Sequence, residues 1–326
     1  MSLSEQFPAQ AGQDARRSRR SFAPAALLLR LTQGPGGRAL VAGLPFLWLS
    51  LFFLVPFIIV LKISLAEAVL AQPPYTPLLD TSNGGVQVRI NLENYRLLFT
   101  DTLYLDAFLN SLKVAGVSTL ICLLVGYPMA YGIARAGRSA RLILLMLIIL
   151  PFWTSFLIRV YAWIGILKDN GLLNNLLLAV GLIDQPLRLL HTEFAVYLGI
   201  VYSYLPFMVL PLYATLARMD LSLLEAAADL GARPWKAFWT VTLPLSLPGV
   251  IAGSLLVFIP AVGEFVIPDL LGGPDTLMMG KVLWTEFFTN RDWPLASAIA
   301  VLLLLTLVAP IMLLQRAEKR AGTEAT

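Results

Sequence analysis

The side chains best placed for chemistry in this 326-residue chain are acids and tyrosines set inside long apolar stretches. Glu193, Tyr197 and Tyr204 fall at i, i+4 and i+11, which places them close to one face of a helix. A carboxylate followed by tyrosine rings suits a cation, through ion pairing and cation–π contact. The alternative is that the tyrosines form part of an interfacial belt, where this residue is common.

A second acid, Glu264, lies in another apolar stretch, one helical turn before Pro268. Acids at membrane depth are costly in lipid, so they usually face a bundle interior or water. Because proline removes a backbone donor and loosens a helix, this point is a candidate gate on a cation path. Glu264 could instead be a structural residue that pairs with Arg159 or Lys113.

The chain is poor in the groups that enzymes use. His191 is its single histidine, which excludes multi-histidine metal sites, and we interpret it as an interfacial polar anchor. No glycine-rich stretch is followed by Lys-Ser or Lys-Thr, so the chain carries no phosphate loop. We therefore expect a non-catalytic protein that binds no cofactor itself, which leaves a channel, a transporter or a scaffold.

The elements that must position these residues are transmembrane helices. With 58% hydrophobic and 13% charged residues, the chain is too apolar for a soluble fold. About 20 residues of helix cross the hydrocarbon core, and we identify six such runs, at 39–61, 107–134, 142–167, 194–217, 245–263 and 294–315. Their length and the lack of period-two alternation favour helices over barrel strands. The expected fold is an all-α integral membrane protein with one six-helix domain over 39–315.

Basic residues predict the orientation of these helices. With the amino terminus inside, the cytoplasmic pieces hold 15 of the 24 Lys and Arg residues, and these pieces are 1–38, 135–141, 218–244 and 316–326. Both termini, the basic tail 1–38 and the short tail 316–326, are therefore expected in the cytoplasm. Topology and anionic lipid explain the arginine-rich tail, so we expect the bilayer and no nucleic acid as its partner. Segment 170–183 has helical period and is predicted to lie at the outer interface.

The cytoplasmic loop 218–244 has a pattern of its own. Ser222 is followed three residues later by Glu225, the spacing of a capping box that begins a helix. Three alanines continue that helix with a thin surface, and Gly231 is placed to end it. Pro234 suits the first turn of a second helix. The sequence thus predicts a short helix, a glycine turn and another helix.

The whole loop is expected to lie across the cytoplasmic face, and Pro244 and Pro248 mark the start of the fifth run. Small residues would let another surface approach closely, and four charged residues supply polar contacts: Glu225, Asp229, Arg233 and Lys236. A docking knob for a soluble partner fits this pattern, and so does an ordinary interfacial helix pair.

The loop resembles the EAA signature of membrane subunits of binding-protein-dependent ABC importers. The matching positions are Glu225, Ala226, Ala227, Gly231, Val241, Leu243 and Pro244, and Val241 stands where isoleucine is usual. The resemblance implies the type I ABC importer permease fold, in which the stretch 225–244, Arg233 included, couples to a groove of an ATPase subunit. A side chain at Gly231 would push the helix pair out of that groove.

Longer stretches, over 150–167, 190–216 and 259–284, resemble the polyamine permeases, first those for putrescine and then those for spermidine. The resemblance implies an ATP-driven importer of the bacterial inner membrane. Its partners would be a second, related permease subunit, two ATPase subunits that bind ATP and Mg, and a periplasmic receptor. A diamine would then be the cation that meets Glu193, the tyrosines and Glu264. An importer of the same architecture for an anion or iron stays open, as does a self-sufficient channel or secondary carrier.

Overall fold

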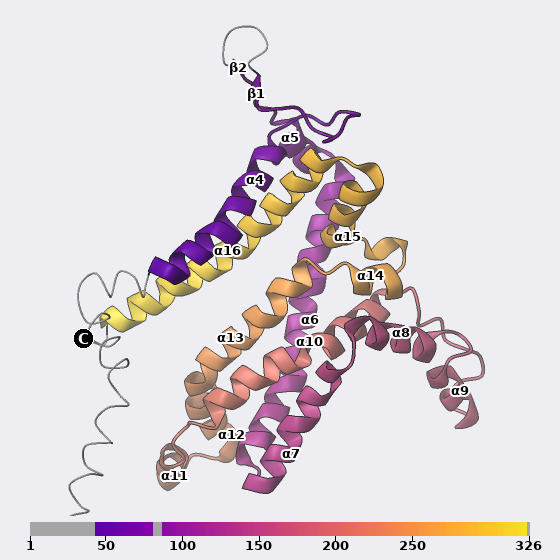
Figure 1. Ribbon diagram of the computed structural model, residues 1–326. Helices are drawn as coiled ribbons and strands as arrows, with labels where there is room; N and C mark the ends of the chain where they lie inside the picture. Colours follow the sequence, from indigo (N-terminus) through magenta and orange to yellow (C-terminus); the bar gives the residue numbers. More distant parts are fainter. Residues whose placement is uncertain (1–42, 81–86, 325–326) are drawn as a thin grey trace, which may run out of the picture. The chain divides into compact units, whose positions relative to one another are not determined.

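The computed structural model describes residues 43–80 and 87–324, and the chain divides into two units, Met1–Leu61 and Lys62–Thr326. Helices make up most of the described chain (Figure 1). The strands in that part of the chain are a two-residue antiparallel pair, β1 (Leu79–Asp80) and β2 (Gln87–Val88). The predicted all-α class is confirmed, whereas the basic tail 1–38 lies outside the described residues.

The described part of the first unit belongs to one long apolar helix. Gly43–Ser64 is 22 residues long and reaches just past the boundary between the units. It contains a π-helical turn, η1 (Ser50–Leu54), and α4 (Val55–Ser64). None of its apolar window is buried. An exposed apolar surface on a helix of this length indicates contact with lipid or with another membrane protein.

Three helices pack against one another in the second unit: α6 (Thr102–Arg135), α10 (Glu193–Leu216) and α13 (Leu243–Val262). Met208 of α10 is fully buried between Gly126 of α6 and Gly253 of α13. A Cβ at Gly126 would lie 3.0 Å from Met208 Cγ, and one at Gly253 would lie 2.8 Å from its sulfur. Small residues allow membrane helices to approach this closely, so these three form the scaffold of the unit.

The third predicted run is broken, and the prediction of one continuous helix over 142–167 is wrong. It forms α7 (Arg138–Ile149), the 3₁₀ turn η2 (Leu150–Trp153) and α8 (Phe156–Leu167), with a bend of 92° at the break. Pro151 cannot donate to the helix ladder, and Thr154 has an extended backbone that interrupts it. After the break, α9 (Leu172–Ala179) provides the helix that the sequence predicts within 170–183.

The fifth run is longer at its start than predicted. α12 (Pro234–Ala237) continues through the π-helical segment η3 (Phe238–Thr242) into α13, so that one 29-residue helix runs from Pro234 to Val262. Beyond it follow four short helices and a long one: α14 (Val266–Leu271), η4 (Pro274–Thr276), α15 (Met279–Trp284), η5 (Thr285–Asn290) and α16 (Trp293–Glu324). The chain therefore folds back on itself between the last two predicted runs.

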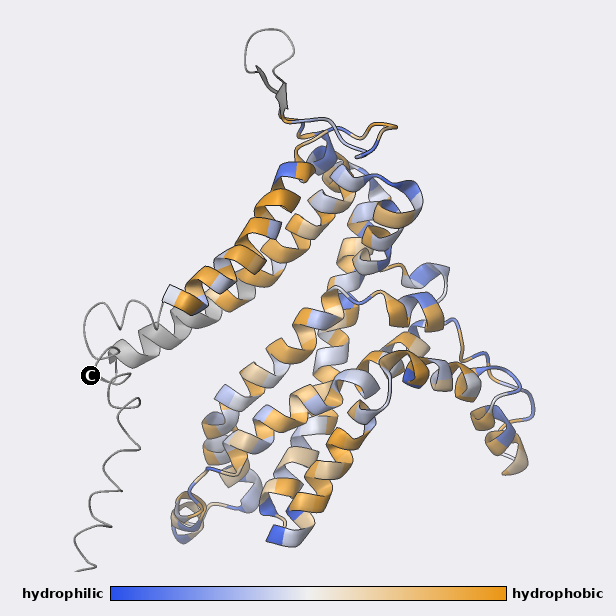
Figure 2. Ribbon diagram, in the orientation of Figure 1, coloured by the Kyte–Doolittle hydropathy of each residue, from blue (hydrophilic) through white to orange (hydrophobic). Residues whose placement is uncertain are grey.

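Among the described residues, four helices are long and apolar enough to cross a membrane, or five if the bent pair counts as one span. Trp293–Val308 is a shorter apolar helix. A count of six spans stays a prediction. Figure 2 shows apolar residues along the long helices and hydrophilic residues at helix ends and in loops. Two short helices lie in these connecting segments, α5 (Glu93–Thr100) and α11 (Ser222–Asp229).

Candidate functional site

The exposed loop between α10 and α13 begins with α11. The Asp220 carboxylate accepts a 3.0 Å hydrogen bond from the Ser222 backbone N–H, and this bond lowers the pKa of Asp220 below its usual value. The predicted capping box is not formed, since α11 has no side-chain hydrogen bond at its N-cap, Leu221. An acid at this helix end is favourable because it also faces the positive end of the helix dipole. Asp220 therefore takes the role that the sequence assigned to Ser222 and Glu225.

Gly231 ends α11, as predicted. Its φ of +78° is a left-handed conformation that glycine adopts without strain. The Ala232 N–H donates to Ala227 O at 2.9 Å and the Gly231 N–H donates to Ala228 O at 2.8 Å, the two bonds of a Schellman cap. A Cβ added at Gly231 would meet no atom within 4 Å. Within this chain, the need for glycine is therefore conformational, and the space above it is open.

The second helix of the loop is not a separate element, because α12 runs into α13 without a break. Pro244 lies near the start of α13 and lacks the N–H that an α-helix requires there. The preceding turn is π-helical, with the Leu243 N–H bonded to Phe238 O. That wider turn accommodates the proline without ending the helix. The predicted second helix of the loop and the fifth run are thus one continuous helix, and the loop boundary at 244 stays a prediction.

In the isolated chain, the loop exposes large apolar side chains to solvent. Trp235 is 71% exposed and Leu230 is 89% exposed. Glu225 and Arg233 of the predicted motif are also exposed, whereas Leu243 packs against the helix core. Phe238 anchors the loop, because its ring packs edge-on against Tyr127 of α6 at 5.5 Å. The arrangement is a rigid knob, joined to α13, that presents aromatic and charged side chains outward.

The predicted cation-binding residues fall into two separate pairs. Lys113 of α6 lies 3.0 Å from Glu193 at the first turn of α10, and both side chains are about half exposed. Tyr197 follows one turn later on the same face of α10. The structure therefore gives Glu193 a lysine partner that the sequence had suggested for Glu264.

Glu264 lies between helices and not within one. α13 ends at Val262, and α14 begins at Val266. The Glu264 carboxylate is 7% exposed, accepts a hydrogen bond from the Tyr204 hydroxyl and caps α14 through the Val266 N–H at 3.0 Å. The expectation that Glu264 and Pro268 share one helix, loosened at the proline, is wrong, because the chain leaves the helix at Gly263. Pro268 is buried in α14.

Arg159, the other suggested partner of Glu264, contacts aromatic rings instead. Its guanidinium lies 5.0 Å from the ring centre of Phe152 and 5.8 Å from that of Phe156. Within the part of the chain that the structure describes, its Nε and Nη1 have no hydrogen-bond acceptor. The ring contacts place Arg159 at the bend between α7 and α8.

A second buried acid, Glu286, was not predicted from the sequence. Glu286, in η5, accepts hydrogen bonds from the Tyr104 hydroxyl at 3.0 Å and from Asn290 Nδ2 at 2.8 Å. It is 9% exposed, and its only sequence signal is an acid inside an aromatic run. No group of three His, Cys, Asp or Glu side chains in the described part of the chain could hold a metal ion.

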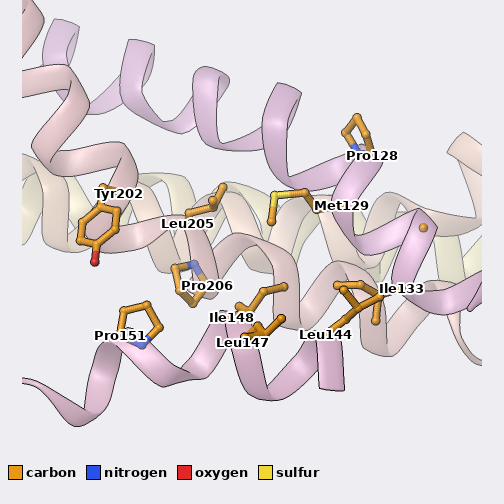
Figure 3. Close-up of a pocket in the computed structure, with 11 residues that line it drawn as sticks. Pro128, Met129, Ile133, Leu144, Leu147, Ile148, Pro151, Tyr202, Leu205 and Pro206 are labelled. Atoms are coloured by element: carbon orange, nitrogen blue, oxygen red, sulfur yellow. The ribbon is translucent and has the colours of Figure 1, made fainter. Parts of the chain in front are cut away.

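An apolar pocket of 460 Å³ opens between α6, α7 and α10 (Figure 3). Its lining is aliphatic apart from Tyr202, with residues such as Met129, Leu147 and Leu205. Without a charged group in its lining, it is unsuited to an ammonium ion and better suited to an alkyl chain. It lies apart from the Lys113–Glu193 and Tyr204–Glu264 pairs, neither of which lines it.

Comparisons with known proteins agree on one family. Residues 123–317 match the family described as "Binding-protein-dependent transport system inner membrane component". The chain is 43% identical over 274 residues to the spermidine/putrescine transport system permease protein PotB of Haemophilus influenzae. That alignment covers 84% of this chain and 91% of the other protein. It is 45% identical over 229 residues to PotB of Escherichia coli, over 70% of this chain and 82% of that protein.

A solved structure shares the fold. The crystal structure of a bacterial alginate ABC transporter in complex with an alginate pentasaccharide-bound periplasmic protein matches with a TM-score of 0.64. The match covers 96% of this chain and 98% of the other, at 17% sequence identity. The ABC importer permease fold and the resemblance to polyamine permeases are confirmed. This chain belongs to the family of inner membrane components of binding-protein-dependent transport systems.

Proposed function

We propose that this chain is the permease subunit of an ATP-driven importer of polyamines. The observation that carries the proposal is its 43% identity to a spermidine/putrescine permease over most of both chains. The half-exposed Glu193 carboxylate supports a cationic substrate, because it can pair with an ammonium group, and Tyr197 follows one turn later on the same face of α10. The buried Tyr204–Glu264 pair lies further along α10 and forms a second polar point on the same path.

The partners follow from the same proposal. The chain forms half of the pathway with a second, related permease subunit, and a periplasmic receptor delivers the amine. Two ATPase subunits bind ATP and Mg, and the exposed loop 218–244 inserts into a groove of one of them. The rigid connection of α12 to α13 supports this coupling role, since a push on the loop is transmitted directly to a spanning helix.

The proposal places the chain in the bacterial inner membrane with both termini in the cytoplasm. The end of α6 and the first turn of α7 carry Arg135, Arg138 and Arg141, and the loop after α10 carries Arg218 and Arg233. Short loops rich in arginine stay on the cytoplasmic side. The Glu193 end of α10 then faces the periplasm, where a receptor delivers substrate.

Uptake by cells tests the substrate. The chain and the products of its neighbouring genes are expressed in a bacterial strain that lacks polyamine uptake, and radiolabelled putrescine and spermidine are measured separately. We expect uptake of at least one polyamine that stops when the ATPase is inactivated. Uptake of an anion or iron in place of polyamines would assign the same architecture to another solute. Polyamine uptake without the ATPase would indicate a channel or secondary carrier.

A further inference from the structure

The Lys113–Glu193 ion pair has the chemistry of an amine site that is already occupied. Lys113 Nζ lies 3.0 Å and 3.1 Å from the two oxygens of Glu193, so one ammonium engages the whole carboxylate. Tyr197 lies four residues after Glu193 on α10, which places its ring on the same face of the helix. An ammonium bound by a carboxylate beside an aromatic ring is the arrangement expected for one end of a bound diamine.

Both members of the pair are accessible to an incoming amine. Their side chains are 54% and 43% exposed, for Lys113 and Glu193 respectively. Lys113 is the single charged residue of α6 between Asp106 and Arg135. A lone charge on a membrane helix faces a bundle interior or water more readily than lipid, which indicates a polar cavity at this face of α6 in the assembled importer. Half-exposed ion pairs contribute little net stability, so a second ammonium can compete.

Glu264 differs from Glu193 in this respect. Its carboxylate is buried and engaged by the Tyr204 hydroxyl and by backbone N–H groups of α14. The Tyr204 ring packs against the core, and the backbone donors are fixed in α14. Lys113, by contrast, holds its ammonium on a flexible four-carbon stem. Of these two acids, Glu193 is the one whose partner can leave.

We propose that Lys113 is a tethered competitor for the substrate amine. Its ammonium occupies the Glu193–Tyr197 site when no substrate is present, and a substrate ammonium displaces it. Without substrate, the Lys113 ammonium neutralises the Glu193 carboxylate, so the site does not retain small inorganic cations. After displacement, the freed lysine repels the bound amine and favours its onward movement. This inference rests on the proposed function, because it takes an organic amine as the substrate.

Binding of radiolabelled putrescine to the assembled importer in lipid nanodiscs, without receptor, tests this competition. We expect Lys113→Met to bind putrescine about three- to fivefold more tightly, because the apparent affinity of a site falls with the fraction that is free, and a half-exposed ion pair keeps that fraction above roughly one tenth. Lys113→Arg keeps the cation and can engage both carboxylate oxygens, so it should show no gain. Glu193→Gln, added to Lys113→Met, should abolish the gain. 1,4-Butanediol, a neutral isostere, should not compete in any variant.

Unchanged or weaker putrescine binding by an assembled Lys113→Met complex overturns the proposal. Failure of that variant to assemble, measured by gel filtration, overturns it as well, because the ion pair is then a structural tether between α6 and α10. If wild type imports putrescine but Lys113→Met shows no gain in putrescine affinity, only the competitor role of Lys113 is refuted, and the proposed function stands. If neither binds putrescine but Lys113→Met gains affinity for another organic cation, such as guanidinium, the polyamine assignment fails and the competitor role stands.

Discussion

At the scale of single residues, the acids of this chain differ in the kind of group that neutralises them. Glu193 faces a lysine ammonium, whereas Glu264 is stabilised by a tyrosine hydroxyl and by the first N–H groups of α14. Glu286 accepts hydrogen bonds from the Tyr104 hydroxyl and from the Asn290 side-chain amide. A buried carboxylate is tolerated where several donors reach it, and each such hydrogen bond contributes about 1.5–3 kcal/mol. Tyr204 is therefore the residue on which the Glu264 environment depends.

We predict that Tyr204→Phe lowers the free energy of unfolding by roughly 1–3 kcal/mol, because the buried Glu264 carboxylate loses one donor. Glu264→Gln should also destabilise the protein, and it should reduce polyamine uptake several-fold because the charge is deleted. The double variant should lose less stability than the sum of the single variants, by at least about 0.5 kcal/mol. Thermal unfolding in detergent measures the cycle, and uptake is normalised to surface level.

Tyr202→Phe is the matched control for this cycle, since Tyr202 lies on the same helix and lines the apolar pocket. It should leave stability and uptake close to wild type. Strict additivity of Tyr204→Phe and Glu264→Gln would show that their hydrogen bond is not significant energetically. Normal uptake with Glu264→Gln would make Glu264 a structural cap of α14 and remove it from the cation path.

At the scale of elements, the loop 218–244 combines a sharp turn with a rigid connection. Gly231 holds the turn in a left-handed conformation, and α12 is continuous with α13. The open space above Gly231 means that a side chain there clashes with nothing in this chain. Its effect on a docked partner can therefore be separated from its effect on folding.

We predict that Gly231→Asp and Gly231→Asn both lower receptor-stimulated ATP hydrolysis by about tenfold or more, which corresponds to about 1.4 kcal/mol of lost docking energy. Asparagine tolerates a positive φ, so its effect cannot come from backbone strain alone. Both variants should insert and assemble. The measurement is ATP hydrolysis by the reconstituted complex with and without receptor.

Gly137→Asp provides the control, because Gly137 has negative φ, also has open space around its Cβ, and lies in the loop between α6 and α7. The reconstituted complex that carries Gly137→Asp should hydrolyse ATP at the wild-type rate. Gly231→Asn could instead give wild-type ATP hydrolysis, with loss only in variants whose side chain does not tolerate a positive φ. The glycine would then be needed only for the backbone conformation of the turn, and the docking role of this surface would be refuted.

At the scale of the whole molecule, the distribution of arginines predicts the orientation. Cysteine introduced by Ser18→Cys or Ser139→Cys, with the buried Cys122 replaced by alanine, should resist a membrane-impermeant thiol reagent added to spheroplasts. Asp184→Cys, in the segment after α9, should react rapidly. Mass spectrometry of the labelled chain gives the extent at each position. Labelling of Ser139→Cys and protection of Asp184→Cys would reverse the orientation.

The sequence by itself determined the features that depend on neighbouring residues. Long apolar runs predicted the helices, because a membrane-spanning backbone must satisfy its hydrogen bonds internally. The alanine-rich segment followed by Gly231 predicted α11 and its end, since a glycine with positive φ closes a helix through bonds within six residues. The spacing of the loop motif also placed the chain in its family, which the comparisons confirmed.

Only the tertiary structure decided which polar groups meet. Lys113 and Glu193 are 80 residues apart, Tyr204 and Glu264 are 60 apart, and Tyr104 and Glu286 are 182 apart. No local period carries this information, because the pairings depend on how α6, α10 and the segment after α13 pack. The break after Trp153 was missed, and Glu264 was expected to share a helix with Pro268, for a related reason. Hydropathy reports how apolar a stretch is, whereas a bend depends on where the backbone leaves the helix and which group caps the next one.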